Sequence, residues 1–312
     1  MRWTPEVPLG LEIAPDALTL VRLRGRGRRR SLAAWRTQPL PPGLINVSPV
    51  EPNVTDQTAF GDALRDLLQG HRAGPVAVAL PDPVARVTLF DVASLPSQGD
   101  DLTRLVRWHL EKTFSVELPS AQFVHQPFRR SDGEVGHRVL ASAIDRAILT
   151  QYEEALLRAG LEPRVVDLAS LHRFNLHRRL IMRLAEPDYH FIVLTIAAAG
   201  LTMMIVEGGT PAYLRIKGTR RALSGPGAVA RILDEVELSL NAYGKEKDLS
   251  RMTHLFVSAT DAAAELSDRL AARFHLTVAI LGSAELPLDG VAALSETEVV
   301  RVSAALGAAA ER

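Results

Sequence analysis

The stretch "LGLEIAPDALTLVRL", Leu9–Leu23, decides the fold class, because it holds two short apolar runs separated by "APDA". Such runs, bounded by turn residues, predict two strands joined in a hairpin. A second stretch, "FIVLTIAAAGLTMMIV" at residues 191–206, has the same design. It is shorter than the roughly 18 to 20 apolar residues that cross a bilayer, so we interpret it as two buried strands. Two distant hairpins of one design indicate two lobes and an internal duplication.

The composition bounds the classes of function. At 312 residues and 47% hydrophobic residues, the chain is long enough for about two domains with packed cores. Basic and acidic side chains balance at 36 each, so no overall positive field attracts nucleic acid, and we expect no nucleic-acid partner. The absence of cysteine excludes disulfides, thiolate metal sites and a cysteine nucleophile. The opening "MRWTPEVPLG" lacks the apolar core of a secretory signal, so we expect a cytoplasmic protein.

Common catalytic motifs are missing. The sequence contains neither a G-x-x-x-x-G-K-[ST] phosphate loop nor a G-x-S-x-G nucleophile elbow. His172 and His177 are five residues apart, which places them about 140° apart on a helix rather than on one face. The residues themselves therefore predict no catalytic group and no metal site.

The first part of the chain is mixed α/β. Strand-like runs "LGLEIA", "LTLVRL" and "PVAVALP" are separated by "DQTAFGDALRDLLQGHRAG", whose apolar residues recur at helical spacing. The expected buried positions of this helix are Phe60, Ala63, Leu64, Leu67 and Leu68.

Residues 86–162 form a block with its own order of elements. Periodicity and turn residues predict strand, helix, strand, strand and helix, at residues 86–92, 100–114, 122–128, 137–143 and 145–159. This order describes a small α+β module.

Besides the two hairpins, the second followed by "GG", five further segments matter here: "LPPGLI", "VAVALPDPVARVTLFDVASLP", "VRWHLEK", "YEEALLRAGLEPRVVDLASL" and "DEVELSLNAY". Each is a loose pattern, and the specific signal is their order from about residue 9 to residue 310. Read in that order, they resemble the PilM family, actin-like cytoplasmic proteins of type IV pilus assembly.

The resemblance implies an α/β architecture: an actin-like (ribonuclease H-like) two-lobed fold with an inserted α+β module of the SHS2 type. It places the first-lobe core at residues 1–85 and 163–187, and the module at residues 86–162. The second lobe is expected at residues 188–312, with a small helical part at about 218–252.

In that family the cleft between the lobes holds ATP through three loops, and the resemblance assigns each loop to residues of this chain. The Asp, Gly and Lys of the first loop fall on Glu12, Ala14 and Thr19. The Asp and Gly of the second loop fall on Thr195 and Ala197, and the Gly pair of the adenosine loop falls on Ser258 and Ala259. Each lost glycine matters, because a Cβ occupies the space where backbone N–H groups approach phosphate. We therefore expect a degenerate site: no cofactor, at most weak ATP binding, and a pseudo-ATPase rather than an enzyme.

The resemblance also implies a partner: the N-terminal cytoplasmic tail of a bitopic inner-membrane protein of the PilN type. The protein is then a scaffold, peripheral to the inner membrane through that partner, and self-association stays open. A sheet edge can bind an extended tail by backbone pairing. The candidate surface comprises Arg86, Val87, Leu89, Arg107 and Trp108. The alternative is that the strand at 86–92 is fully paired in its own sheet, and that Arg107 and Trp108 are ordinary surface and core residues.

Two other functions stay open. An active actin-like ATPase or sugar-kinase-like enzyme is consistent with the two hairpins and with the carboxylate of Glu12, but it requires a second carboxylate where Thr195 stands. A cytoplasmic component of a type II secretion platform shares the expected fold and scaffold role. That relative normally continues into a membrane-spanning segment, which we do not expect here.

Overall fold

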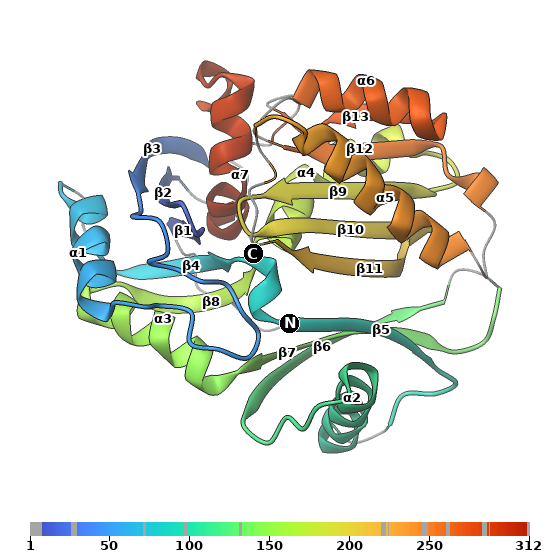
Figure 1. Cartoon of the computed structure of the whole chain (residues 1–312), viewed down its shortest axis with the longest axis horizontal. Coiled ribbons are helices and arrows are strands. Elements are labelled where there is room, and N and C mark those ends of the chain that lie inside the picture. Colours follow the sequence, from blue (N-terminus) through green and yellow to red (C-terminus); the bar gives the residue numbers. More distant parts are fainter. Residues whose placement is uncertain are drawn as a thin grey trace.

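The structure is a computed structural model of the chain, and the residues that it describes form two large sheets and one small one (Figure 1). The residues that it describes are 8–25, 30–70, 73–96, 99–130, 133–219, 223, 225–244, 249–259, 263–282, 286 and 288–310.

The first-lobe sheet has five strands in the order β3-β2-β1-β4-β8. The β1–β2 hairpin and β3 are antiparallel, whereas β4 and β8 run parallel to β1. The strands are β1 (Leu9–Ile13), β2 (Ala17–Arg24), β3 (Ser31–Pro39), β4 (Pro75–Leu80) and β8 (Glu162–Leu168).

The second-lobe sheet repeats this plan, with the order β11-β10-β9-β12-β13. The β9–β10 hairpin takes the place of β1–β2, and β12 and β13 run parallel to β9. The strands are β9 (Phe191–Ala197), β10 (Gly200–Glu207), β11 (Thr210–Gly218), β12 (His254–Ser258) and β13 (Thr277–Ile280). The two hairpins therefore begin two sheets of the same order, which agrees with the two-lobed plan expected from the sequence.

Large side chains cover one face of the first-lobe sheet. There α1 (Gln57–Leu68) and α3 (Arg146–Arg158) pack on Leu11, Ile13 and Val78. Asp56 is the N-cap of α1, and its carboxylate accepts hydrogen bonds from the backbone amides of Thr58 and Ala59. The expected apolar stripe of this helix is buried in full.

Small residues line the opposite face of the same sheet, where α7 (Glu296–Ala310) packs. A Cβ at Gly10 would lie 1.8 Å from the Ala305 carbonyl oxygen, so this contact requires glycine. Ala77 and Ala79 also face α7. Because α7 is built of small residues, helix and sheet approach closely.

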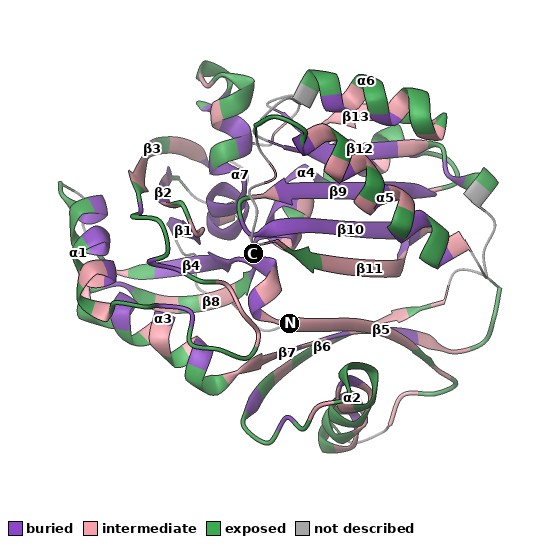
Figure 2. Ribbon diagram, viewed as in Figure 1, coloured by how far each residue is buried: buried purple, intermediate pink, exposed green. Residues whose placement is uncertain are grey.

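Helix α4 (Ala169–Leu184) lies between the lobes (Figure 1). Its Leu176 packs with α7 against the first lobe, whereas Leu180 and Ile181 pack on the second-lobe sheet. The far face of the second-lobe sheet is covered by α5 (Ala228–Gly244) and α6 (Ala263–Phe274). Figure 2 shows β9 and β10, which lie between these layers, buried along their length.

The inserted module is a three-stranded antiparallel sheet, ordered β5-β7-β6, with one helix on it. Its core joins α2 to the sheet through Val106, Leu110 and Val139. The elements are β5 (Arg86–Val92), α2 (Gly99–Phe114), β6 (Ala121–Arg129) and β7 (His137–Asp145). The described residues also include three 3-10 turns: η1 (Asp82–Val84), η2 (Leu249–Arg251) and η3 (Val291–Ala293).

The structure corrects two domain boundaries. The module ends near residue 145, not 162, because α3 buries Ile148, Tyr152 and Leu156 in the first-lobe core. The second lobe does not include residues 296–310, because α7 returns to the first-lobe sheet. Among the described residues, no helix is both long enough and apolar enough to span a bilayer.

Candidate functional site

A small cavity lies between the tips of the two hairpins, and we call it the closed cleft. Its volume is only about 20 Å³, enough for roughly one water molecule. Both lobes contribute to its walls, which include Glu12, Ala14, Asp82, Arg173, Thr195, Ala197 and Thr202.

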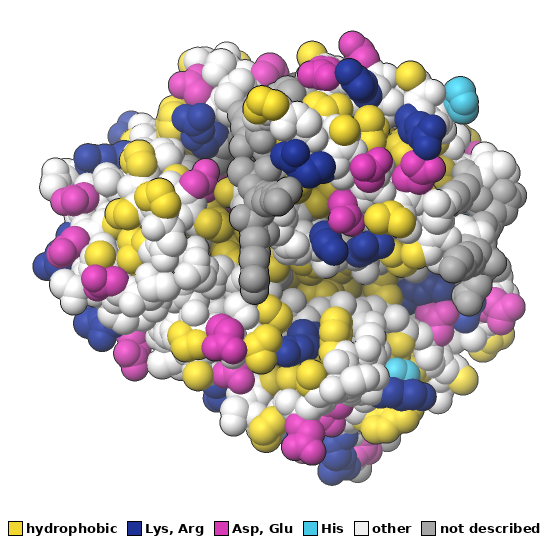
Figure 3. All heavy atoms as spheres, in the orientation of Figure 1, with side chains coloured by type: hydrophobic (Ala, Val, Ile, Leu, Met, Phe, Trp, Pro, Cys, Tyr) yellow, Lys and Arg dark blue, Asp and Glu magenta, His cyan; other side chains and the backbone are white. Residues whose placement is uncertain are grey.

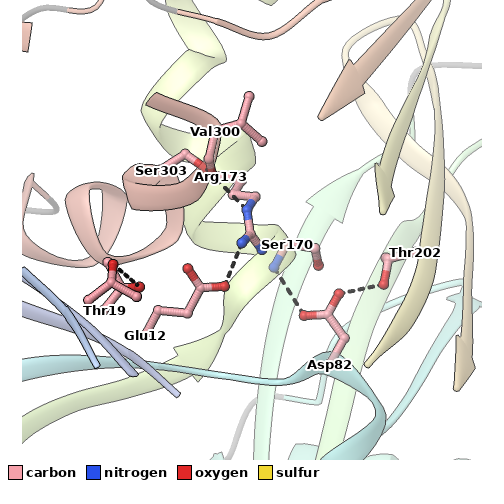
Figure 4. A network of polar contacts seen from close by, with 9 residues as sticks. Glu12, Thr19, Asp82, Ser170, Arg173, Thr202, Val300 and Ser303 are labelled. Carbon is pink, nitrogen blue, oxygen red and sulfur yellow. Dashed lines mark hydrogen bonds and ion pairs between the residues drawn. The ribbon is translucent and has the colours of Figure 1, made fainter. Parts of the chain in front are cut away.

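The Arg173 side chain fills the first-lobe side of the closed cleft. From α4 its Nη2 donates to the Glu12 carboxylate on β1, and both side chains are 8% exposed. Its Nε donates to the Ser303 hydroxyl of α7 at 3.1 Å (Figure 4). The Arg173 guanidinium thus joins α4 to β1 and α7. It pairs with the Glu12 carboxylate, which the resemblance assigned to the nucleotide site.

Asp82 makes the second set of contacts in the closed cleft. It follows β4, and its carboxylate accepts a hydrogen bond from the Ser170 amide at 3.0 Å, at the start of α4. The other carboxylate oxygen accepts from the hydroxyl of Thr202 on β10 (Figure 4). Asp82 therefore joins the first lobe to the second.

Burial governs the electrostatics of Glu12. It raises the pKa of the Glu12 carboxyl above its ordinary value, and the Arg173 guanidinium opposes that rise. A buried carboxyl of this kind is stable only with its partner in place.

The predicted nucleotide residues divide into two groups. Glu12, Ala14, Thr195 and Ala197 line the closed cleft. Thr19 lies outside the lining and its hydroxyl contacts that of Thr37 at 3.2 Å. Ser258 and Ala259 are buried at the end of β12, also outside the lining.

These residues do not fit a magnesium-bound nucleotide. Both carboxylates of the closed cleft already have partners, and no group of three or more ligands suited to a metal occurs among the described residues. The space in front of the cleft is wider, about 1010 Å³, but its described charged lining residues are Asp16 and Glu51. Among the described lining residues, a triphosphate there would meet two like charges and no cation.

A second depression, which we call the edge groove, lies between β5 of the module and β11 of the second lobe. Its volume is about 690 Å³. Each strand is the edge of its own sheet, and both are half-buried (Figure 2). Figure 3 shows hydrophobic side chains in the hollow between these two parts of the molecule. The described lining includes Val47, Pro49, Arg86, Val87, Leu89, Phe114, Tyr213, Leu214 and Ile216.

Three of the five residues predicted to bind the partner line this groove: Arg86, Val87 and Leu89. Arg86 also donates to the Pro49 carbonyl at 2.9 Å. The other two lie elsewhere on α2. The Arg107 guanidinium stacks over Phe123, and Trp108 is a surface residue, 52% exposed.

Sequence reasoning missed the residues that close the cleft. Arg173 lies in a helix whose neighbours His172, Leu176 and His177 are buried, so a cation within an apolar stripe was the available signal. Asp82 stands between two prolines where a buried strand ends, a position that often carries function in α/β proteins.

No protein-family model and no curated protein matches the chain. Solved structures do. The PilM-PilN type IV pilus biogenesis complex matches at 22% identity and a TM-score of 0.77, covering 98% of each chain.

Two further structures are more distant. A Bacteroides thetaiotaomicron protein with an actin-like ATPase fold and unknown function matches at 9% identity and a TM-score of 0.51, over 88% of this chain and 90% of that one. The cytoplasmic domain of EpsL, an inner-membrane component of the Vibrio cholerae type II secretion system, reaches a TM-score of only 0.47 at 11% identity, over 80% of this chain and 81% of that one. The chain therefore has the actin-like fold, in the arrangement found in PilM.

Proposed function

We propose that this chain is a PilM-like cytoplasmic scaffold of type IV pilus assembly. The observation that carries the proposal is the match to PilM over 98% of both chains, which includes the inserted module. The partner is the N-terminal cytoplasmic tail of a bitopic inner-membrane protein of the PilN type. Through that tail the scaffold is held at the inner membrane.

The edge groove is the proposed docking site. An extended segment can pair with a strand edge while apolar pockets receive alternate side chains. The groove offers the edge of β5 and partly exposed apolar side chains such as Val87, Leu89 and Ile216. The opposite edge of the module suits a strand poorly, because Pro127 on β6 lacks an amide proton.

Docking is tested with the purified chain and a fluorescent peptide of the PilN-like tail. We expect Leu89→Asp to weaken binding at least about tenfold, which corresponds to about 1.4 kcal/mol. The matched control is Val124→Asp, on the other edge strand of the same sheet, where Val124 is 62% exposed. Equal affinities for the two variants would place the site elsewhere, and no binding by the wild-type chain would refute the partner.

We propose further that the scaffold does not hydrolyse ATP. The supporting geometry is the pairing of Glu12 with Arg173 and of Asp82 with Thr202, which leaves neither carboxylate available to position a magnesium ion. Turnover is measured with magnesium and millimolar ATP. We expect none above background, and a rate of about 1 per second, ordinary for enzymes, would favour the ATPase alternative. We also expect no shift of several degrees in melting temperature with ATP.

A further inference from the structure

The two walls of the edge groove are not joined by a strand ladder. Strand β5 pairs with β7, and β11 pairs with β10. In the part of the chain that the structure describes, no ladder connects β5 to β11, although the two strands lie side by side. The spacing between the module wall and the second-lobe wall is therefore set by contacts other than a strand ladder.

Asp82 and Thr202 provide that contact. Asp82 begins the turn η1, which leads directly into β5, so its position sets where β5 starts. Thr202 lies on β10 opposite Ile216 of β11, and Ile216 lines the groove. The buried hydrogen bond between the Thr202 hydroxyl and the Asp82 carboxylate thus joins the two walls through one residue on each side.

The connection from Asp82 to β5 is short and stiff. Pro83 has a fixed φ angle, and it lines both the closed cleft and the edge groove. The Ala85 amide donates back to the Asp82 carbonyl at 3.2 Å, which closes the turn. At the same end of the groove Pro83 lies near Gly218, the last residue of β11, where an added Cβ would be 3.3 Å from the Pro83 Cβ.

We infer that Asp82 and Thr202 are positioning residues that hold the edge groove at the spacing its ligand needs, without any nucleotide in the cleft. The inference rests on the proposed function, because it assigns regulation to the groove proposed for docking. Binding of the partner segment is then independent of ATP, since the contact between the lobes is made by the chain itself.

A purely structural role for the same hydrogen bond makes a different prediction. Loss of a buried bond lowers overall stability, but it does not by itself change the distance between two folded parts. The deciding measurement is therefore a distance across the groove in the folded protein. Because the chain has no cysteine, spin labels can be attached at Glu117→Cys in the module and Leu238→Cys on α5 without removing native thiols. Leu238 is 55% exposed.

Three substitutions separate the hydroxyl from the side-chain shape. Thr202→Val keeps the shape and removes the donor, whereas Thr202→Ser keeps the donor. Thr195→Val is the matched control, because Thr195 lies opposite Thr202 on β9 in the same cavity but does not contact Asp82. We expect Thr202→Val to shift or broaden the label distance and to weaken tail binding at least about tenfold. Thr202→Ser and Thr195→Val are expected to resemble the wild type in both measurements.

The outcomes are distinguishable. An unchanged label distance in folded Thr202→Val overturns the inference, whatever the peptide does. If Thr202→Val changes the label distance but the wild-type chain does not bind the tail, the result supports the contact and refutes the proposed partner.

If Thr202→Val does not fold, Asp82→Asn replaces it. The amide keeps an acceptor for Ser170 but loses the charged acceptor for Thr202, so a smaller change in the same direction is expected, and no change overturns the inference.

Discussion

The closed cleft and the edge groove lie along the same boundary between the lobes, and Pro83 and Ala199 line both. They differ in volume, about 20 Å³ against about 690 Å³, and in chemistry. In the cleft, Glu12 and Asp82 have partners within the chain. In the groove, two strand edges and half-buried apolar side chains face a large open space.

This contrast supports the proposal that the fold keeps its shape without a nucleotide. Buried charges must be paired, so a cleft that binds no magnesium or phosphate needs an internal cation, and Arg173 supplies it. The apolar groove needs no such compensation and can stay open. The following predictions test whether the cleft is structural and the groove functional.

The largest expected effect is on the ion pair. Arg173→Met leaves Glu12 buried without its cation, so we expect the free energy of unfolding to fall by about 3–5 kcal/mol. Urea denaturation measures it.

The double variant Glu12→Leu with Arg173→Met is the control. It removes both charges, so the loss should be much smaller than the sum of the two single losses. If the double variant instead loses as much stability as the two single variants together, the two side chains do not close the cleft as a pair.

The next prediction tests how tightly α7 packs on β1, the strand that carries Glu12. Gly10→Ala would place a methyl group against the Ala305 carbonyl, and we expect it to destabilise the fold by about 1–3 kcal/mol. Gly61→Ala in α1 is the control, because a Cβ there meets no atom within 4 Å. That change should stabilise by roughly 0.5–1 kcal/mol through helix propensity. If both variants have wild-type stability, the contact is looser than described.

The lobes were predictable from sequence because their signals are local. The strand pairs at 9–23 and 191–206, and the apolar stripe Phe60–Leu68, lie within short windows. The return of α7 to the first lobe was not predictable in this way. Its signal is the match between small residues on α7 and Gly10, Ala77 and Ala79, which are far away along the chain.

The site was predictable only in part, for a related reason. Family positions identified Glu12 and Thr195 as cleft residues, and the structure places both there. Their partners Arg173 and Thr202 depend on which helix and strand meet at the boundary, which no local pattern encodes. Arg107 and Trp108 were chosen because they lie near β5 in the expected module, but α2 turns them away from the groove.

A smaller effect is expected at the groove itself. Arg86→Glu reverses a charge on the lining and removes the bond to the Pro49 carbonyl, so tail binding should weaken by roughly fivefold, about 1 kcal/mol. Arg107→Glu, on the same module but outside the groove, is the control and should leave affinity unchanged. If Arg107→Glu weakens binding and Arg86→Glu does not, the tail docks on α2 instead.

The smallest expected effect concerns pH and the closed cleft. His177 of α4 contacts the Arg173 carbonyl at 2.9 Å and the Gly282 carbonyl at 3.1 Å. Burial lowers the pKa of His177, and these two carbonyl contacts oppose the change. Between that lowered pKa and the ordinary value of about 6.5, the unfolded chain binds more protons than the folded one.

The free energy of unfolding should therefore decrease as pH falls below about 6.5, and part of that decrease should disappear in His177→Gln, which cannot take up the proton. Urea denaturation of both proteins between about pH 8 and pH 5 measures the difference. Parallel curves for the two proteins would show that His177 does not contribute. Because His177 contacts Arg173 and lies outside the edge groove, tail affinity measured where both proteins remain folded should not follow this pH change.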